Sequence, residues 1–173
     1  MKRFVGILVL IILVILTGQQ AKAQGFKFGH VNTDEIIKAM PEYDTAMAKL
    51  EKTRQELVNT LQLMSVELKN KADAYDKESK TLTDIVRQTK EQELQDLQTR
   101  IQNFQTQAQT TLQEQQVTLT QPIFSKVDKA IKDVGKEGGF IYVFDVAKGQ
   151  VLYFDETKST NVIAMVKTKL GLK

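Results

Sequence analysis

The sequence contains no cysteine and no tryptophan, and only two prolines and one histidine among its 173 residues. The lack of cysteine excludes disulfides, thiol catalysis, cysteine-bound metals and a lipid anchor on an N-terminal cysteine. His30 has no partner ligand or nucleophile at a usable spacing, so a structural role is the better interpretation. No glycine-rich nucleotide-binding motif and no serine nucleophile elbow occur. We therefore predict that the chain is not an enzyme and uses no cofactor or metal.

Two further groups allow a functional interpretation that we do not favour. Asp145 and Asp155 could form an acid–base pair, but an aspartate at the end of a strand is more often a turn or cap residue. The aromatic residues between Phe140 and Phe154 could stack on bases, but their spacing is typical of a sheet and no basic groove accompanies them. Nucleic acid is therefore not a predicted partner.

The first 23 residues have the features of a secretory signal peptide. Lys2 and Arg3 precede an apolar run of 13 residues, Phe4 to Leu16, and Ala21-Lys22-Ala23 resembles a cleavage site. The run is short for a membrane anchor, which needs about 20 residues, although a retained anchor is the alternative. Without this leader the chain holds 21 basic and 21 acidic residues, because the leader contributes 3 of the 24 basic ones and no acid. The sequence therefore predicts export, with cleavage near Ala23.

Residues 41–121 form a long segment without internal glycine or proline, and we expect them to be helical. A heptad runs along its first half on Tyr43, Leu50, Leu57 and Met64 and on Met47, Leu61, Leu68 and Tyr75, with Arg54 as an interruption. A second series in a different register follows, on Leu94, Leu97, Ile101, Phe104, Ala108 and Leu112. The heptads predict coiled-coil-like helices. The register break predicts an antiparallel hairpin with its tip near residues 78–84; one continuous helix of twice the length is the alternative.

The two prolines of the chain bracket this arm. Pro41 is expected at the first turn of the outgoing helix, and Pro122 is expected to close or kink the returning one. Thr81 or Thr83 could cap the start of the returning helix.

The remaining residues, 24–40 and 122–173, are predicted to form a small β-rich body. A strand at Phe26–Val31 precedes a short helix at Glu35–Met40, for which Asn32 to Asp34 offer caps. A helix over Ile123–Val134 ends at the glycines that follow it. Two β-rich runs, Phe140–Asp145 and Gln150–Phe154, read as a hairpin. Asn161 is expected to cap a last helix that carries Val162, Met165, Val166 and Leu170 on one face. The predicted fold class is α+β.

A hairpin with one seam and a small open sheet are both marginal alone, so we expect self-association through the body. The candidate oligomerisation residues are Phe28, Val31, Ile141, Val143, Val151 and Tyr153. Several arms on one hub would form a cage whose apolar side chains could hold non-native chains weakly. The candidate client-binding residues are Val58, Leu63, Met64, Val66, Tyr75 and Val86. From these patterns alone, a structural coiled-coil spacer is an equally good interpretation.

Several segments together resemble the Skp/OmpH family of periplasmic chaperones. They are Gly29-His30-Val31-Asn32, Met40-Pro41-Glu42-Tyr43, the arm segment from Arg87 to Gln95, and the ending from Ile131 through Val143-Phe144-Asp145 and Val151-Leu152-Tyr153. The resemblance covers nearly the whole chain after the leader. It implies a homotrimer with a β-rich hub and three helical tentacles. It also implies ATP-independent holding of unfolded outer-membrane proteins in the periplasm.

The charge of the arms departs from the strongly basic pattern that is common in this family. Residues 42–121 hold 10 basic and 13 acidic side chains, and the tip region from Lys69 to Lys90 holds 6 basic and 4 acidic ones. We therefore expect apolar, shape-based capture to dominate over charge, and membrane contact to be weak or absent.

Overall fold

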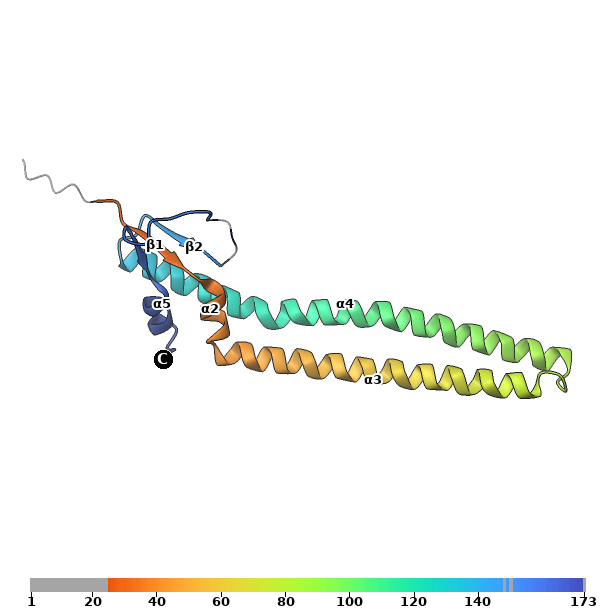
Figure 1. The fold of residues 1–173 in the computed structure, drawn as a ribbon. Helices are drawn as coiled ribbons and strands as arrows, with labels where there is room; N and C mark the ends of the chain where they lie inside the picture. Colours follow the sequence, from red (N-terminus) through yellow and green to blue (C-terminus); the bar gives the residue numbers. More distant parts are fainter. Residues whose placement is uncertain (1–24, 148, 150, 173) are drawn as a thin grey trace, which may run out of the picture.

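The computed structural model describes residues 25–147, 149 and 151–172, so the predicted leader lies outside the described residues. The molecule has a small body at one end, from which a long helical hairpin projects (Figure 1). The elements in chain order are β1 (Phe28–Val31), α2 (Thr33–Lys38), α3 (Pro41–Glu78), α4 (Asp84–Glu137), β2 (Tyr142–Asp145), β3 (Ser159–Asn161) and α5 (Ile163–Lys169). The predicted α+β class with a long antiparallel hairpin is confirmed.

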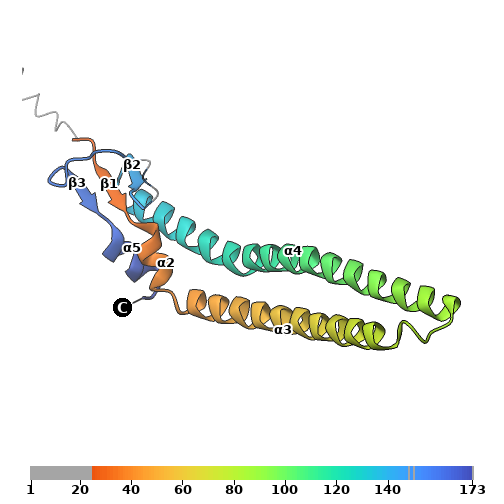
Figure 2. The same ribbon diagram turned by 45° about the vertical axis from the view of Figure 1, so that its right-hand side comes forward.

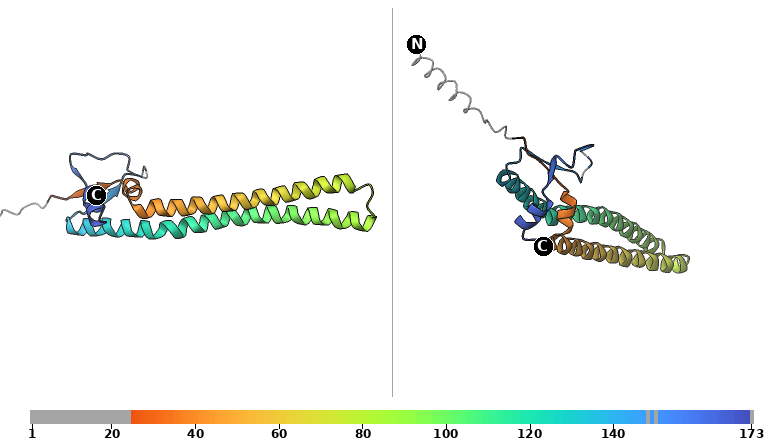
Figure 3. Two further views of the ribbon diagram at one scale, coloured as in Figure 1. Left: turned by 90° about the horizontal axis from the view of Figure 1, so that it is seen from below. Right: turned by 60° about the vertical axis from the view of Figure 1, so that its left-hand side comes forward.

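Helices α3 and α4 run side by side in every view of the molecule (Figure 3). The chain reverses between Glu78 and Asp84, within the segment where the heptad register breaks, so the alternative of one continuous helix is wrong. The 38 residues of α3 correspond to about 57 Å at 1.5 Å per residue. Pro41 is at the first turn of α3, as expected, and Thr83 is the N-cap position of α4 without a side-chain capping bond.

The two helices meet along an apolar seam that both heptad series supply. Its α4 side includes Leu97 and Ala108, which are 3% and 6% exposed. The α3 side is half-buried at every predicted heptad residue from Tyr43 to Tyr75. Arg54, the interruption in the series, is exposed and binds Glu51 on its own helix with two hydrogen bonds of 2.8 and 2.9 Å. A seam between two helices therefore shields most of its residues from solvent only partly. Leu97 and Ala108 are the exceptions among the residues named here.

Pro122 does not close the returning helix. Helix α4 continues through it to Glu137, over 54 residues, and Figure 2 shows the helix passing from the arm into the body. An interior proline removes one backbone hydrogen bond and costs about 3 kcal/mol. The helix is maintained because the residues beyond the proline are deeply buried in the body: Ile123, Val127, Ala130 and Val134.

The sheet of the body is parallel, with the order β2-β1-β3. Phe28 lies opposite Tyr142 on one side and Ser159 on the other. The predicted antiparallel hairpin of Phe140–Asp145 with Gln150–Phe154 is therefore wrong. Residues 151–155 form no strand, and the chain crosses instead to the other edge of β1, where Ser159–Asn161 pair. Gln150 itself lies outside the described residues.

One face of this sheet packs on the helices and forms the main core. Its most buried side chains are Val31, Ile36, Met40, Val162 and Val166, all at most 1% exposed. Gly29 in β1 is closely surrounded, because a Cβ atom there would lie 3.2 Å from both Phe140 Cδ1 and Val162 Cγ1.

Polar side chains cap the short helices beside the sheet. Asn32 caps α2, as predicted, since its Oδ1 accepts a bond of 3.2 Å from the Glu35 amide. The helix occupies Thr33–Lys38, two residues earlier than expected. Asn161, the expected cap of α5, lies one residue before the N-cap position, which Val162 occupies, and its Oδ1 accepts a bond of 2.9 Å from the Ile163 amide.

Candidate functional site

The hairpin exposes large apolar side chains along its length. Four of the six predicted client-binding residues are among them: Val58 is 47% exposed, Leu63 71%, Val66 48% and Val86 42%. The sequence analysis missed Ile85, which is 80% exposed, and Val117, which is 57% exposed. Both are apolar residues outside the heptad positions of α4, so the heptad pattern could have predicted their exposure.

Leu63 and Val66 point away from the seam, whereas Val58 flanks it, because it is one residue, or about 100°, from Leu57. Val66 is nine residues from the seam residue Leu57, or about 180° around the helix, and Leu63 is two residues, or about 200°, from Leu61. Leu63 and Val66 are three residues apart and are therefore neighbours on the helix surface, and Gln55 and Asn59 form a side-chain hydrogen bond of 3.0 Å nearby. Small apolar groups thus alternate with polar side chains along the hairpin. Such a surface suits weak contacts with many sequences rather than tight binding of one ligand.

Met64 and Tyr75, the other two predicted residues, are half-buried in the seam. The Tyr75 hydroxyl donates a hydrogen bond to a carboxylate oxygen of Glu91 on the opposite helix. This bond raises the pKa of Tyr75, because the ionised phenolate would lose it and would face a carboxylate. These two side chains therefore connect the helices and offer less free surface than the other four.

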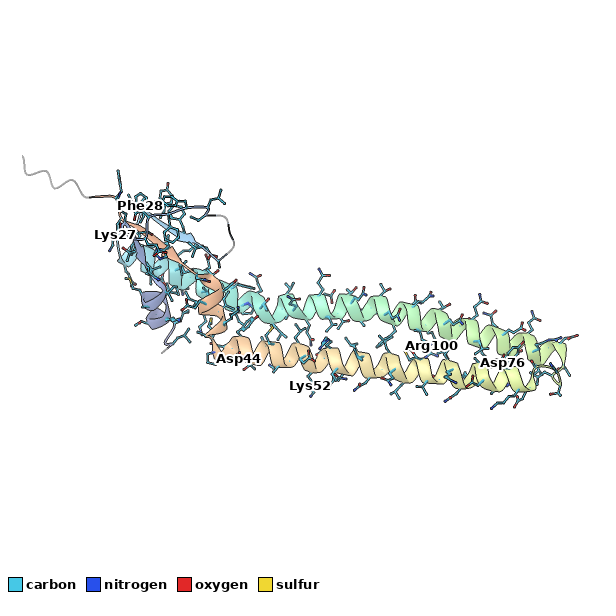
Figure 4. The ribbon with its side chains drawn as sticks, in the orientation of Figure 1. Lys27, Phe28, Asp44, Lys52, Asp76 and Arg100 are labelled. Carbon is cyan, nitrogen blue, oxygen red and sulfur yellow. The ribbon has the colours of Figure 1, made fainter. Side chains whose placement is uncertain are left out.

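The outer third of the hairpin is linked by polar contacts across the helices. Lys71 Nζ lies 3.5 Å from Glu93 Oε2, and Lys90 Nζ lies 3.8 Å from Glu78 Oε2. Nearer the body, α4 has only Glu114 as a charged residue between Ile101 and Ser125. Figure 4 shows the side chains along both helices of the hairpin. The ionic groups near the tip thus serve partly to hold the hairpin together.

The outer face of the sheet in the body is aromatic and exposed. Phe28 and Tyr142 stack with their ring centroids 6.3 Å apart, and Tyr142 and Phe144 with theirs 5.8 Å apart. Phe28 is 36% exposed, Tyr142 59% and Phe144 42%. His30 contacts the Phe154 ring at 4.6 Å, and its Nδ1 is 2.9 Å from Ser159 Oγ. The only histidine of the chain thus has a structural setting on this face.

The predicted oligomerisation residues differ in their exposure. Phe28, Ile141 and Tyr153 are exposed, whereas Val143 and Val151 are half-buried. Val31 is 1% exposed and belongs to the core of its own chain, so it has no surface for a second copy. The exposed large apolar residues of the body that were not among the predicted oligomerisation residues are Phe26, Phe124, Tyr142, Phe144, Leu152 and Met165.

The two aspartates are engaged in local structure. Asp145 accepts bonds from the Thr33 hydroxyl at 2.6 Å and from the Ala147 amide at 3.0 Å. Asp155 accepts bonds from Thr157, whose hydroxyl and amide lower the pKa of its carboxyl group. Within the part of the chain that the structure describes, no cluster of three or more metal-ligating side chains occurs. Both aspartates therefore have the turn and cap roles that their positions suggested.

A family model described as "Outer membrane protein (OmpH-like)" matches residues 27–170. The chain belongs to this OmpH-like family. The match extends from β1 to the end of α5 and so includes the whole hairpin and the whole body. A search of curated proteins found no match.

Membership in the OmpH-like family gives the chain a coarse functional assignment. This is a family of periplasmic, chaperone-like proteins for outer-membrane proteins and not a family of enzymes. Two of the segments that resemble the family occupy structural junctions. Gly29-His30-Val31-Asn32 contains most of β1 and the cap of α2. Met40-Pro41-Glu42-Tyr43 joins the body to the hairpin. Among the described residues, none of the helices has the length and apolarity required to cross a membrane.

Proposed function

We propose that the protein is an ATP-independent holdase of the periplasm that binds unfolded outer-membrane proteins and prevents their aggregation before insertion. The observation that carries this proposal is the set of exposed apolar side chains on the hairpin, from Val58 to Val117. A surface for unfolded chains needs apolar side chains that a client can reach, and Leu63 at 71% exposure meets that need.

We further propose that the working form is a homotrimer assembled through the body. The sheet has only three strands, of which β2 and β3 are edges, and its outer face carries exposed Phe28, Tyr142 and Phe144. A small parallel sheet with one bare apolar face is stabilised when another copy covers it. Three hairpins on one hub would surround a common space and present their apolar groups to one client.

Export follows in this proposal from the first 23 residues, which are expected to be removed near Ala23. The protein would then act as a nearly neutral chain of 21 basic and 21 acidic residues. Capture would depend mainly on apolar contacts, because the arms carry a net charge of only −3, from 10 basic and 13 acidic residues.

The test is suppression of aggregation in the absence of ATP. A urea-denatured β-barrel protein is diluted into buffer with the purified exported protein, and light scattering is followed. A threefold excess of trimer is expected to abolish the scattering increase, and an equal mass of a non-chaperone coiled coil serves as the control. Unchanged scattering would reject the holdase and favour a structural role. Light scattering of the protein alone gives its absolute mass, and a monomer would reject the trimer.

A further inference from the structure

An apolar pocket lies at the base of the hairpin, apart from the surfaces described above. It has a volume of about 430 Å³, which is within the range that binds small ligands or one or two large side chains. Its apolar lining comes from Met40, Pro41, Ala46, Leu119, Pro122 and Ile123. Both prolines of the chain are in this lining, one from each helix of the hairpin.

The residues that line the pocket explain why the space remains open. Pro41 and Ala46 on α3 are short side chains, and Pro122 on α4 presents a compact ring. Leu119 and Ile123 flank that ring, and Met40 is 1% exposed beneath it. Elsewhere in the arm, longer side chains such as Leu57 and Phe104 occupy the seam. Methionine adapts its shape readily, so this wall can fit side chains of different form.

The rim of the pocket is polar and carries an excess of positive charge. Lys126 Nζ and Glu42 Oε1 are 2.5 Å apart and neutralise each other across the two helices. Lys49, one turn beyond Thr45 on α3, also lines the pocket, and it forms no ion pair with any residue that the structure describes. The pocket thus combines an apolar floor with one uncompensated ammonium group at its edge.

We propose that this pocket binds a bulky apolar side chain of an unfolded client where that side chain is followed or preceded by Asp or Glu. The apolar side chain would lie against Ala46 and Ile123, and the neighbouring carboxylate would pair with Lys49. A lysine at the rim favours such a carboxylate through a charge-assisted hydrogen bond. This inference rests on the proposed holdase function and adds a preference that the scattered apolar groups of the arm do not provide.

Two labelled peptides of 20 residues test the preference. Both have Gly-Ser spacers and three phenylalanines; each phenylalanine is followed by Asp in one peptide and by Lys in the other. Fluorescence anisotropy is expected to show roughly five- to tenfold tighter binding of the Asp peptide. Lys49→Glu is expected to remove or reverse this difference. The matched control is Lys52→Glu, which lies on the same helix outside the pocket (Figure 4) and is expected to keep the preference.

A second variant fills the pocket without changing charge. Thr45 is exposed on α3 and lines the pocket, so Thr45→Phe is expected to fold normally and to weaken both peptides. Equal affinities of the wild-type protein for the two peptides would overturn the proposal. A Thr45→Phe protein with unchanged peptide binding but a changed mass in solution would also overturn it, because a second copy would then occupy the pocket. Aggregation suppression by the wild-type protein is measured in parallel. Absence of suppression contradicts the holdase proposal, whereas suppression together with equal peptide affinities contradicts only the pocket proposal.

Discussion

Leu63 and Leu97 provide a matched pair of substitutions that separates a binding surface from a structural one. Both are leucines in the interior of long helices, but Leu63 is 71% exposed and Leu97 is 3% exposed. Replacement by alanine removes the same atoms in both cases and slightly favours helix formation in both. Any difference between the two variants therefore reports what covers each side chain.

The expected losses of stability differ severalfold. Leu97→Ala leaves a cavity in the seam and is expected to cost about 2–3 kcal/mol, the lower end of the usual range, because a two-helix seam can partly close. Fully burying a leucine contributes about 1.5–3 kcal/mol, and less than a third of the Leu63 surface is covered. Leu63→Ala is therefore expected to change the free energy of unfolding by less than about 1 kcal/mol.

Guanidinium unfolding followed by circular dichroism measures both variants at one fixed protein concentration, because assembly contributes to stability. Aggregation suppression is then measured at 20 °C, where both variants remain folded. We expect Leu63→Ala to hold less client at unchanged stability, and Leu97→Ala to hold client normally at reduced stability. If Leu63→Ala costs as much stability as Leu97→Ala and holds client normally, Leu63 is covered by a sister arm, and the structural coiled-coil interpretation is correct.

Three other predictions follow from particular contacts. Gly29→Ala is expected to cost about 1–3 kcal/mol in urea unfolding, because its Cβ would meet Phe140 and Val162 at 3.2 Å; Gly25→Ala, with no atom within 4 Å of the new Cβ, is the control and should be neutral. The raised pKa of Tyr75 means that its bond to Glu91 stabilises the hairpin below the ordinary pKa of 10.0 and is lost as pH rises through the higher folded value; ultraviolet titration should lose its last phenolate step in Tyr75→Phe, and loss of a step at the ordinary tyrosine pKa instead would contradict the bond. Client holding is expected to weaken less than about threefold between 50 and 500 mM salt, since the capture is mainly apolar; a loss of about a hundredfold would show that charge dominates.

Local patterns were sufficient to predict the hairpin. Heptad spacing depends only on neighbours three and four residues apart, and the change of register between Tyr75 and Leu94 favoured a reversal between them over one continuous helix. Pro41 and Asn32 act within one turn of their helices, so their roles were also predictable. The exposure of Val58, Leu63 and Val66 followed from the same helical periodicity.

The sheet was not predictable in the same way, because its pairing is non-local. Phe28 pairs with Tyr142 and Ser159, more than 110 residues away, and nothing in the spacing of a short β-rich run distinguishes a parallel partner from an antiparallel one. The β propensity of Val151–Phe154 suggested a strand, yet the central strand β1 has only two edges and both are occupied by β2 and β3. Of the two outcomes expected at Pro122, closing the helix was wrong for a related reason: the burial that maintains α4 beyond it comes from the body, which the local sequence does not reveal.

In the proposed holdase, the arms would hold a client firmly only by many simultaneous contacts. Most of their charges are paired within the arm, as in Lys69–Asp73 and Lys71–Glu93, so they add little net attraction. Covering one half-exposed valine or leucine contributes about 0.5–1.5 kcal/mol, which by itself corresponds to negligible affinity. Six such side chains occur on one hairpin, Val58, Leu63, Val66, Ile85, Val86 and Val117. Linked binding to three hairpins would raise the effective affinity by orders of magnitude without a strong site. Because each contact is weak and breaks independently, a client could leave stepwise, and release would need no ATP.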